Sequence, residues 1–182
     1  MCSTQVESAP KTERLFFALW PSDAVRQALR RHCKALLRHS GGRPVAPENW
    51  HITLAFLGTV EATQRACAEQ VAAGIHLPPF ALRLDHVGHW ARPQVLWIGA
   101  SDTPDTLRSL ADRLAQGSRD CGLALDKRPF VNHLTLKRKV DRPPAKLDIK
   151  PVDWAVTDFV LVRSRTLPEG VQYTVVNRWP LT

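Results

Sequence analysis

Two short stretches of the sequence, WHITLAF at residues 50–56 and NHLTLKR at residues 132–138, contain the same four-residue string, His-x-Thr-Leu. The chain has 7 histidines, and about 0.06 such strings would be expected by chance in a chain of this composition. Side chains alternate between the two faces of a strand. Each stretch is therefore predicted to be a strand that buries its apolar residues and presents an imidazole beside a hydroxyl.

The segments around the two strings follow the same order along the chain. An amphipathic helix over residues 22–39, which follows a predicted strand at 14–20, is stopped by the SGG of 40–42, and a Pro-containing connection leads to the first string. A helix that Thr103 caps and Gly122 closes, followed by another Pro-containing connection, leads to the second string. This recurrence indicates a diverged internal duplication with two similar halves.

The remaining runs complete an α+β pattern in one domain. Residues 61–73 are predicted to be a second, Ala-rich helix, and the run 80–90 a strand that pairs with 94–100. Residues 154–164 and 171–179 are predicted strands around a TLPEG turn, and the Pro-rich, basic stretch 141–151 is a predicted loop. We expect residues 1–13 to be a disordered tail and residues 14–182 to form a single bilobal domain.

Composition limits the classes of protein to which the chain can belong. The formal net charge of +8 over 182 residues and the pI near 9.9 favour polyanionic partners, and a basic surface selected only for solubility is the alternative interpretation. No stretch approaches the roughly 18 apolar residues that a membrane span requires, so no membrane association is expected. The cysteines are scattered without a Cys-x-x-Cys pair, which predicts reduced thiols and a cytoplasmic location for Cys2, Cys33, Cys67 and Cys121.

The repeated string has a definite chemical use if the two halves face each other. His51 and His133 would then flank one cleft, and imidazole has an unperturbed pKa of about 6.5, so one ring can be protonated while the other is neutral. One ring would deprotonate water and the other would protonate a leaving oxygen. Thr53 and Thr135 would donate hydrogen bonds to phosphoryl oxygens, and this arrangement requires no metal.

The strings HITLAFLG and NHLTLKR resemble the paired His-x-Thr motifs of the 2H phosphoesterase superfamily. Among its members, the bacterial and archaeal RNA 2′,3′-cyclic phosphodiesterases, also called 2′-5′ RNA ligases, are the most similar. The resemblance spans nearly the whole chain, from RLFFALWP through RPQVLWIG and RPFVNHLTLKR to YTVVNRWPL. It implies an α+β fold with two pseudo-symmetric lobes of antiparallel sheet and outer helices around a central cleft.

The resemblance also implies an activity and residue roles. The activity is the metal-independent hydrolysis of RNA 2′,3′-cyclic phosphate ends to 2′-phosphomonoesters, and the reverse 2′-5′ ligation would exchange the acid and base roles. By position, His51 would protonate the 3′ oxygen, His133 would activate water, and Thr53 and Thr135 would hold the phosphate.

Phe56 and Arg138 would clasp the base according to the same resemblance. Strict alternation puts each of them on the face opposite its histidine, so this role requires a bend in the strand. Without the bend, Phe56 would lie in the core and Arg138 in solvent. Asn132 stands where the family usually has proline, which restores a backbone N–H and leaves the local turn open.

Other polar and aromatic residues are expected to have lesser roles. Trp50 would hold its strand in place by burial, and Arg14 and Lys137 would lie on a solvated face, from which they could reach a phosphate. His32 and His39 are expected to face solvent on the first helix, and His76, His86 and His89 lack a threonine partner. None of these five histidines is expected to be catalytic.

Two alternatives to this enzyme remain open. One is a non-catalytic module that binds RNA ends, although both His-x-Thr strings are intact. The other is a metallohydrolase that uses both histidines as ligands, although there is no His-Glu-x-x-His string and no acidic residue within two positions of His51 or His133. The preferred prediction is a monomeric enzyme without cofactor or metal, acting on RNA with 2′,3′-cyclic phosphate ends or on small cyclic nucleotides.

Overall fold

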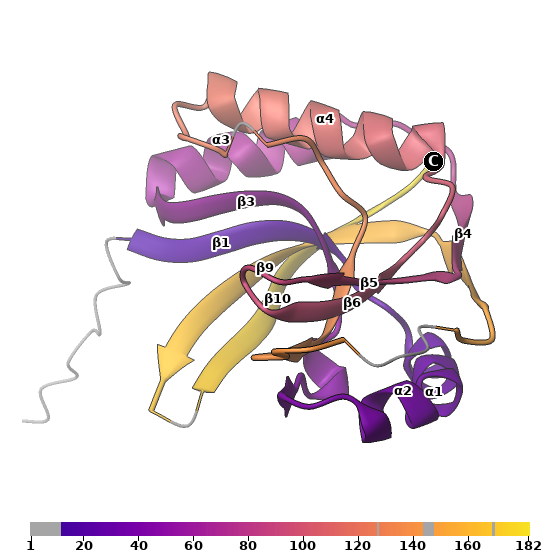
Figure 1. The fold of residues 1–182 in the computed structure, drawn as a ribbon. Helices are drawn as coiled ribbons and strands as arrows, with labels where there is room; N and C mark the ends of the chain where they lie inside the picture. Colours follow the sequence, from indigo (N-terminus) through magenta and orange to yellow (C-terminus); the bar gives the residue numbers. More distant parts are fainter. Residues whose placement is uncertain (1–11, 127, 144–147, 169) are drawn as a thin grey trace, which may run out of the picture.

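The computed structural model describes residues 12–126, 128–143, 148–168 and 170–182 and has an α+β architecture (Figure 1). The helices are α1 (Asp23–His32), α2 (Lys34–His39), α3 (Ala62–Ala73), α4 (Asp105–Asp120) and the 3₁₀ turn η1 (Pro47–Asn49). The strands are β1 (Thr12–Leu19), β2 (Arg43–Pro44), β3 (Ile52–Glu61), β4 (Phe80–Leu84), β5 (His86–Trp90), β6 (Val95–Gly99), β7 (Leu134–Arg138), β8 (Val152–Val156), β9 (Asp158–Leu167) and β10 (Gly170–Pro180).

Both His-x-Thr strings lie at the centre of one 8-stranded sheet. Its order is β10-β9-β1-β3-β7-β6-β5, with β2 paired to the end of β7, and the neighbouring strands are antiparallel. The strand of each string begins one residue after its histidine, and β3 meets β7 at the pair Ile52–Leu134. The predicted antiparallel α+β fold is confirmed, and the two halves share a continuous sheet.

The order of elements supports the predicted duplication. β1 leads into α1 and pairs with β3, while β6 leads into α4 and pairs with β7. In each half, therefore, the strand before the first helix becomes the antiparallel neighbour of the strand that follows the histidine.

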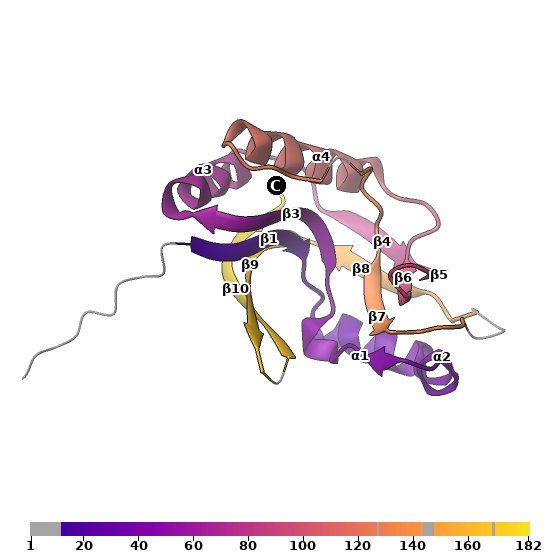
Figure 2. The ribbon, with the colours of Figure 1, turned by 60° about the vertical axis from the view of Figure 1, so that its left-hand side comes forward.

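The helices lie in two groups around this sheet. α3 and α4 pack against each other and against β3, and α1 packs against β8 (Figure 2). Most buried apolar residues form one core between the strands and the helices, whereas a smaller cluster of Phe16, Ala18, Val160 and Val162 covers the other face of β1 and β9. No helix within the described ranges combines the length and apolar character needed to cross a bilayer.

The predicted helix over 22–39 is interrupted. Ser22 caps α1 as expected, since its side chain accepts a hydrogen bond from the Val25 N–H at 3.4 Å. Cys33, with φ −91° and ψ 4°, separates α1 from α2 and is fully buried. The start of the fourth helix also differs, because Pro104 rather than Thr103 is the N-cap.

Two predicted strands are each divided between two sheets. The run 80–90 breaks at Asp85, so that β4 pairs with β8 in a separate 2-stranded sheet while β5 joins the main sheet. The Asp85 carboxylate accepts hydrogen bonds from the N–H and hydroxyl of Ser101 at 2.8 and 2.9 Å, which holds the chain at this break. The run 154–164 breaks in the same way at Thr157, between β8 and β9.

The domain begins earlier than predicted. β1 starts at Thr12, and Glu13 forms ion pairs with Arg65 at 2.6 Å and Arg163 at 3.1 Å, so the predicted tail does not reach residue 13. Residues 1–11 lie outside the described residues. The predicted loop 141–151 contains no helix or strand in the part that is described.

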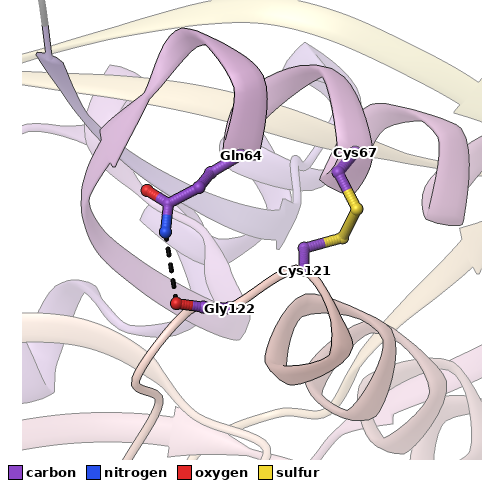
Figure 3. The surroundings of a disulfide bond; sticks show 4 residues. All are labelled: Gln64, Cys67, Cys121 and Gly122. Atoms are coloured by element: carbon purple, nitrogen blue, oxygen red, sulfur yellow. Dashed lines mark hydrogen bonds between the residues drawn. A yellow bond between two sulfur atoms is a disulfide. The ribbon is translucent and has the colours of Figure 1, made fainter.

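The prediction of reduced thiols is wrong for two cysteines. Cys67 of α3 and Cys121 at the end of α4 form a disulfide, beside which the Gln64 amide donates to the Gly122 carbonyl at 3.2 Å (Figure 3). The spacing of 54 residues hides this pairing in the sequence, because the close packing of α3 on α4 creates it. Cys33 remains a free thiol, and burial raises its pKa to about 12. The thiols therefore no longer support a cytoplasmic location.

We predict that the disulfide contributes measurably to stability. A loop of 54 residues loses chain entropy worth about 4 kcal/mol in the unfolded state when it is closed. The Cys67→Ser/Cys121→Ser double variant should therefore lower the free energy of unfolding by about 2–4 kcal/mol, measured by urea denaturation. Dithiothreitol should lower the stability of the wild-type protein and leave that of the double variant unchanged. Coincident wild-type curves with and without reductant would contradict the prediction.

Candidate active site

The central strand pair brings the two His-x-Thr strings together. Ile52 pairs with Leu134 in antiparallel register, so the residue before each of them stands opposite the residue after the other. His51 therefore stands opposite Thr135, and His133 stands opposite Thr53. The same pairing buries Ile52 and Leu134 completely, which places the histidines and threonines on the opposite face of the sheet.

A β-bulge follows the threonine in β3. Thr53 pairs with Ala18 and Ala55 with Phe17, so Leu54 is the extra residue without a partner in β1. The bulge reverses the alternation, and Phe56 comes to lie opposite Phe16, on the face that carries Thr53. The Phe56 side chain is 44% exposed, and the Arg14 guanidinium lies 4.9 Å from the centre of its ring.

β7 contains a bulge at the equivalent position. Thr135 pairs with Trp97 and Lys137 with Leu96, which leaves Leu136 as the extra residue. Arg138 consequently lies opposite Val95 and on the face of Thr135. The bend that the base-binding role of Phe56 and Arg138 required is therefore present in both strands.

Each histidine is oriented by a backbone carbonyl two residues before it. The Nδ1 atom of His51 lies 2.7 Å from the Asn49 oxygen, and that of His133 lies 2.8 Å from the Val131 oxygen. Because a carbonyl only accepts, Nδ1 carries the proton in both rings and donates it. Nε2 is therefore the nitrogen of each ring that can exchange a proton with a substrate.

Aromatic side chains surround both imidazoles. The His51 ring stacks on Trp20 with centroids 5.6 Å apart and contacts Phe16 at 4.8 Å and Tyr173 at 5.2 Å. The His133 ring makes an edge contact with Trp90 at 4.6 Å. These four aromatic residues were not predicted to belong to the site. All of them lie in runs that the sequence predicts to be strands, but nothing in the sequence indicates which strands flank the two strings.

Burial makes both histidines weaker bases than free imidazole. The pKa of His51 is lowered to about 4: desolvation is the largest cause, the Asn49 carbonyl opposes it, and the electrostatic effects of His133 and Arg138 add to the lowering. The pKa of His133 is lowered by desolvation and by Arg138, against the effect of the Val131 carbonyl. The free site is thus neutral at its two imidazoles near pH 7 and has a cation beside them.

Asn132 anchors the second string to the neighbouring strand. Its side chain is buried, its Oδ1 accepts from the Ala100 N–H at 2.6 Å, and its Nδ2 donates to the Ala100 carbonyl at 3.3 Å and to the Thr103 hydroxyl. A side-chain amide here replaces the conformational restriction of a proline with hydrogen bonds to the segment that joins β6 to α4. Asn132 therefore holds the backbone immediately before His133.

Lys137 and Trp50, which were expected to have lesser roles, are both buried. Lys137 does not face solvent: it is buried, and its ammonium donates to the carbonyls of Leu37, at 3.0 Å, and Ser40, because the Leu136 bulge turns it toward α2. Trp50 is buried as predicted, with its Nε1 donating to the Val45 carbonyl at 3.0 Å.

Two of the other histidines are engaged with the backbone. The Nδ1 atom of His32 lies 2.9 Å from the Lys150 carbonyl oxygen, and the Nε2 atom of His89 lies 2.7 Å from the Val140 carbonyl oxygen. Within the ranges that the structure describes, no group of three or more His, Cys, Asp and Glu side chains is arranged to hold a metal ion.

Comparison with known proteins identifies the family. The family model described as LigT like phosphoesterase matches twice, at residues 19–97 and 98–173, in agreement with the two similar halves. The chain is 35% identical to the RNA 2′,3′-cyclic phosphodiesterase of Escherichia coli, over 93% of this chain and 97% of the relative. It is 32% identical to that of Archaeoglobus fulgidus, over 88% and 96% of the two chains.

Solved structures agree with this assignment. The E. coli LigT structure complexed with 3′-AMP superimposes with a TM-score of 0.84 at 36% identity, over 94% of this chain and 99% of that one. The Thermus thermophilus protein TT0787 gives a TM-score of 0.76 at 28% identity, over 92% and 97%. With its two motif strands paired at the centre of this fold, the chain belongs to the LigT-like phosphoesterases of the 2H superfamily, the family of the RNA 2′,3′-cyclic phosphodiesterases.

Proposed function

We propose that the protein hydrolyses RNA 2′,3′-cyclic phosphate ends to 2′-phosphomonoesters without a metal ion. The observation that carries this proposal is the convergence of two imidazole–hydroxyl pairs on one face of the sheet, around the Ile52–Leu134 pair. The relatives from E. coli and A. fulgidus are named for this activity, and the E. coli structure was solved with an adenosine monophosphate.

The two histidines divide the proton transfers between them. Nε2 of His133 takes a proton from water as its oxygen attacks phosphorus, and Nε2 of His51 gives a proton to the 3′ oxygen as the P–O3′ bond breaks. The 2′-phosphate remains on the ribose. In 2′-5′ ligation a 5′-hydroxyl takes the place of water, so each histidine keeps its role, and the two roles are exchanged only when a 2′-5′ linkage is cleaved.

The threonines and Arg138 act on the charge of the phosphoryl group. The hydroxyls of Thr53 and Thr135 donate to the non-bridging oxygens, and this stabilisation grows as negative charge develops in the transition state. Arg138 contributes a positive charge on the same face. A bound phosphate anion opposes the charges that lower the pKa of His51, so binding favours the protonated acid that the reaction needs.

Phe56 and Arg138 contact the base of the terminal nucleotide in this proposal. Both lie beside a threonine on the same face, and Phe56 is exposed enough to stack on a planar ring. The substrates are RNA ends or small cyclic nucleotides. We further propose that the chain acts as a monomer, because one chain supplies both strings and the aromatic residues around them.

The histidine variants test the assigned chemistry. His51→Ala and His133→Ala should each lower kcat for a nucleoside 2′,3′-cyclic phosphate by about 10²- to 10⁴-fold, because each removes one proton transfer. Product analysis should show the 2′-phosphate, and EDTA should leave the wild-type rate unchanged. A 3′-phosphate product would overturn the leaving-group assignment, and loss of the rate in EDTA would point to a metallohydrolase. RNA binding without turnover by the wild-type protein would leave only an end-binding module.

The pH dependence of kcat/KM tests the electrostatics of the free site. Since burial and Arg138 hold the pKa of both histidines below the usual value, the protonated acid is lost at lower pH than for free imidazole. We expect kcat/KM to fall about tenfold per pH unit as the pH rises through neutrality.

Arg138→Gln should move that falling limb to higher pH, because it removes a positive charge that lowers both pKa values. Arg113→Gln, an exposed change of equal charge on α4, is the matched control and should not move the limb. An unchanged limb in Arg138→Gln would refute this account, whatever the height of the profile.

A further inference from the structure

A row of aromatic side chains lies beside His133 on the face of the sheet that carries Thr135. Trp97 of β6 pairs with Thr135 on one side and with Gly88 of β5 on the other, so all three share that face. His86 and Trp90 lie two residues from Gly88 on the same strand and therefore project from the same face. We call His86, Trp90 and Trp97 the β5–β6 aromatic face.

The backbone of β5 is adapted to this arrangement. A Cβ atom on Gly88 would lie only 2.1 Å from Cζ2 of Trp97, so only glycine at this position lets the indole lie across the strand. Trp97 then contacts Trp90 at 5.2 Å and His86 at 5.5 Å between ring centroids. With Trp90 in contact with His133 at 4.6 Å, the aromatic surface is continuous from the edge of the sheet to the catalytic ring.

This surface is open and has a cationic side chain beside it. His86 is exposed, and Trp90 and Trp97 are partly exposed. Trp90 pairs with Val95, which pairs in turn with Arg138, so Trp90 and Arg138 lie in one row across three strands, on either side of Val95. Aromatic rings next to a cation are the usual means by which proteins bind bases of single-stranded nucleic acid without sequence preference.

The hydrolysis proposed above does not use this face. Phe56 lies in the other half of the sheet and would take the base of the nucleotide that carries the cyclic phosphate. His51 stands at the start of the strand that carries Phe56, and His133 contacts Trp90 of the β5–β6 aromatic face. A site with a base platform on each side of one phosphate fits two nucleotides joined through that phosphate.

We propose that the β5–β6 aromatic face binds the base of a second nucleotide, the one joined through its 5′ oxygen in a 2′-5′ linkage. This inference rests on the proposed function, in which His133 activates water. In a 2′-5′ dinucleotide, O5′ occupies the position of that water, so the second nucleotide lies on the side of His133.

The corresponding cleavage is balanced without a further reactant. The 3′-hydroxyl of the first nucleotide attacks phosphorus and loses its proton to His51. The P–O5′ bond breaks, and O5′ takes a proton from His133. The products are a 2′,3′-cyclic phosphate and a 5′-hydroxyl nucleoside, and ligation is the same step reversed.

Paired substrates test the platform. For each protein we would measure the ratio of kcat/KM for a 2′-5′ dinucleotide to that for the matching nucleoside 2′,3′-cyclic phosphate. Trp90→Leu should lower this ratio by about 5- to 100-fold, the range expected from the loss of one stacked base, and Trp90→Phe should largely restore it. Phe56→Leu is the matched control: it should lower kcat/KM for both substrates and leave their ratio unchanged. An unchanged ratio in Trp90→Leu, with an unfolding midpoint like that of the wild type, would overturn the proposal.

A binding measurement separates this proposal from the hydrolysis on which it rests. The probe is a 3′-deoxy 2′-5′ dinucleotide with 2-aminopurine as the second base, which cannot react because it lacks the attacking hydroxyl. Wild-type protein should quench its fluorescence and Trp90→Leu should not. Quenching by a protein that turns over no cyclic phosphate would retain the platform and reject the hydrolysis. Turnover of the cyclic phosphate without quenching of the probe would retain the hydrolysis and reject the platform.

Discussion

The antiparallel pairing of Ile52 with Leu134 is the constraint on which the site depends. The two residues are 82 positions apart in the chain (134 − 52 = 82), and the backbone around this pair is what joins the two halves into one sheet. Because both side chains are fully buried, a shift of either strand by one residue would turn the apolar residues of that strand toward the face that now carries the histidines and threonines. The apolar part of each string thus fixes the position of the polar part.

The bulges at Leu54 and Leu136 supply what regular alternation could not. Each inserts one buried leucine and so rotates the rest of its strand, with the result that Phe56 and Arg138 share a face with the threonines. In β7 the same rotation sends Lys137 inward, where carbonyls from the α2 region satisfy its ammonium. One local irregularity thus determines both the position of Arg138 on the face of Thr135 and a contact between the sheet and the α2 region.

The electrostatics of the site follow from its surroundings more than from the histidines themselves. Aromatic neighbours and burial disfavour a charged imidazole, and Arg138 adds to that effect. An anionic phosphate, bound as we propose, would reverse the balance by pairing with Arg138 and favouring a protonated ring. The site is therefore suited to bind a negative charge before it moves a proton, in keeping with the net charge of +8.

The sequence by itself determined the paired His-x-Thr strings, the order of elements in the two halves and the family, because these depend on residue type and short spacing. It placed Phe56 and Arg138 only conditionally, since alternation is a local rule and a bulge depends on the neighbouring strand. The aromatic contacts of His51 and His133, the inward position of Lys137 and the Cys67–Cys121 disulfide were decided by the tertiary structure. Each of these joins residues that are distant in the chain, and only the packing of strands and helices brings such residues within contact distance.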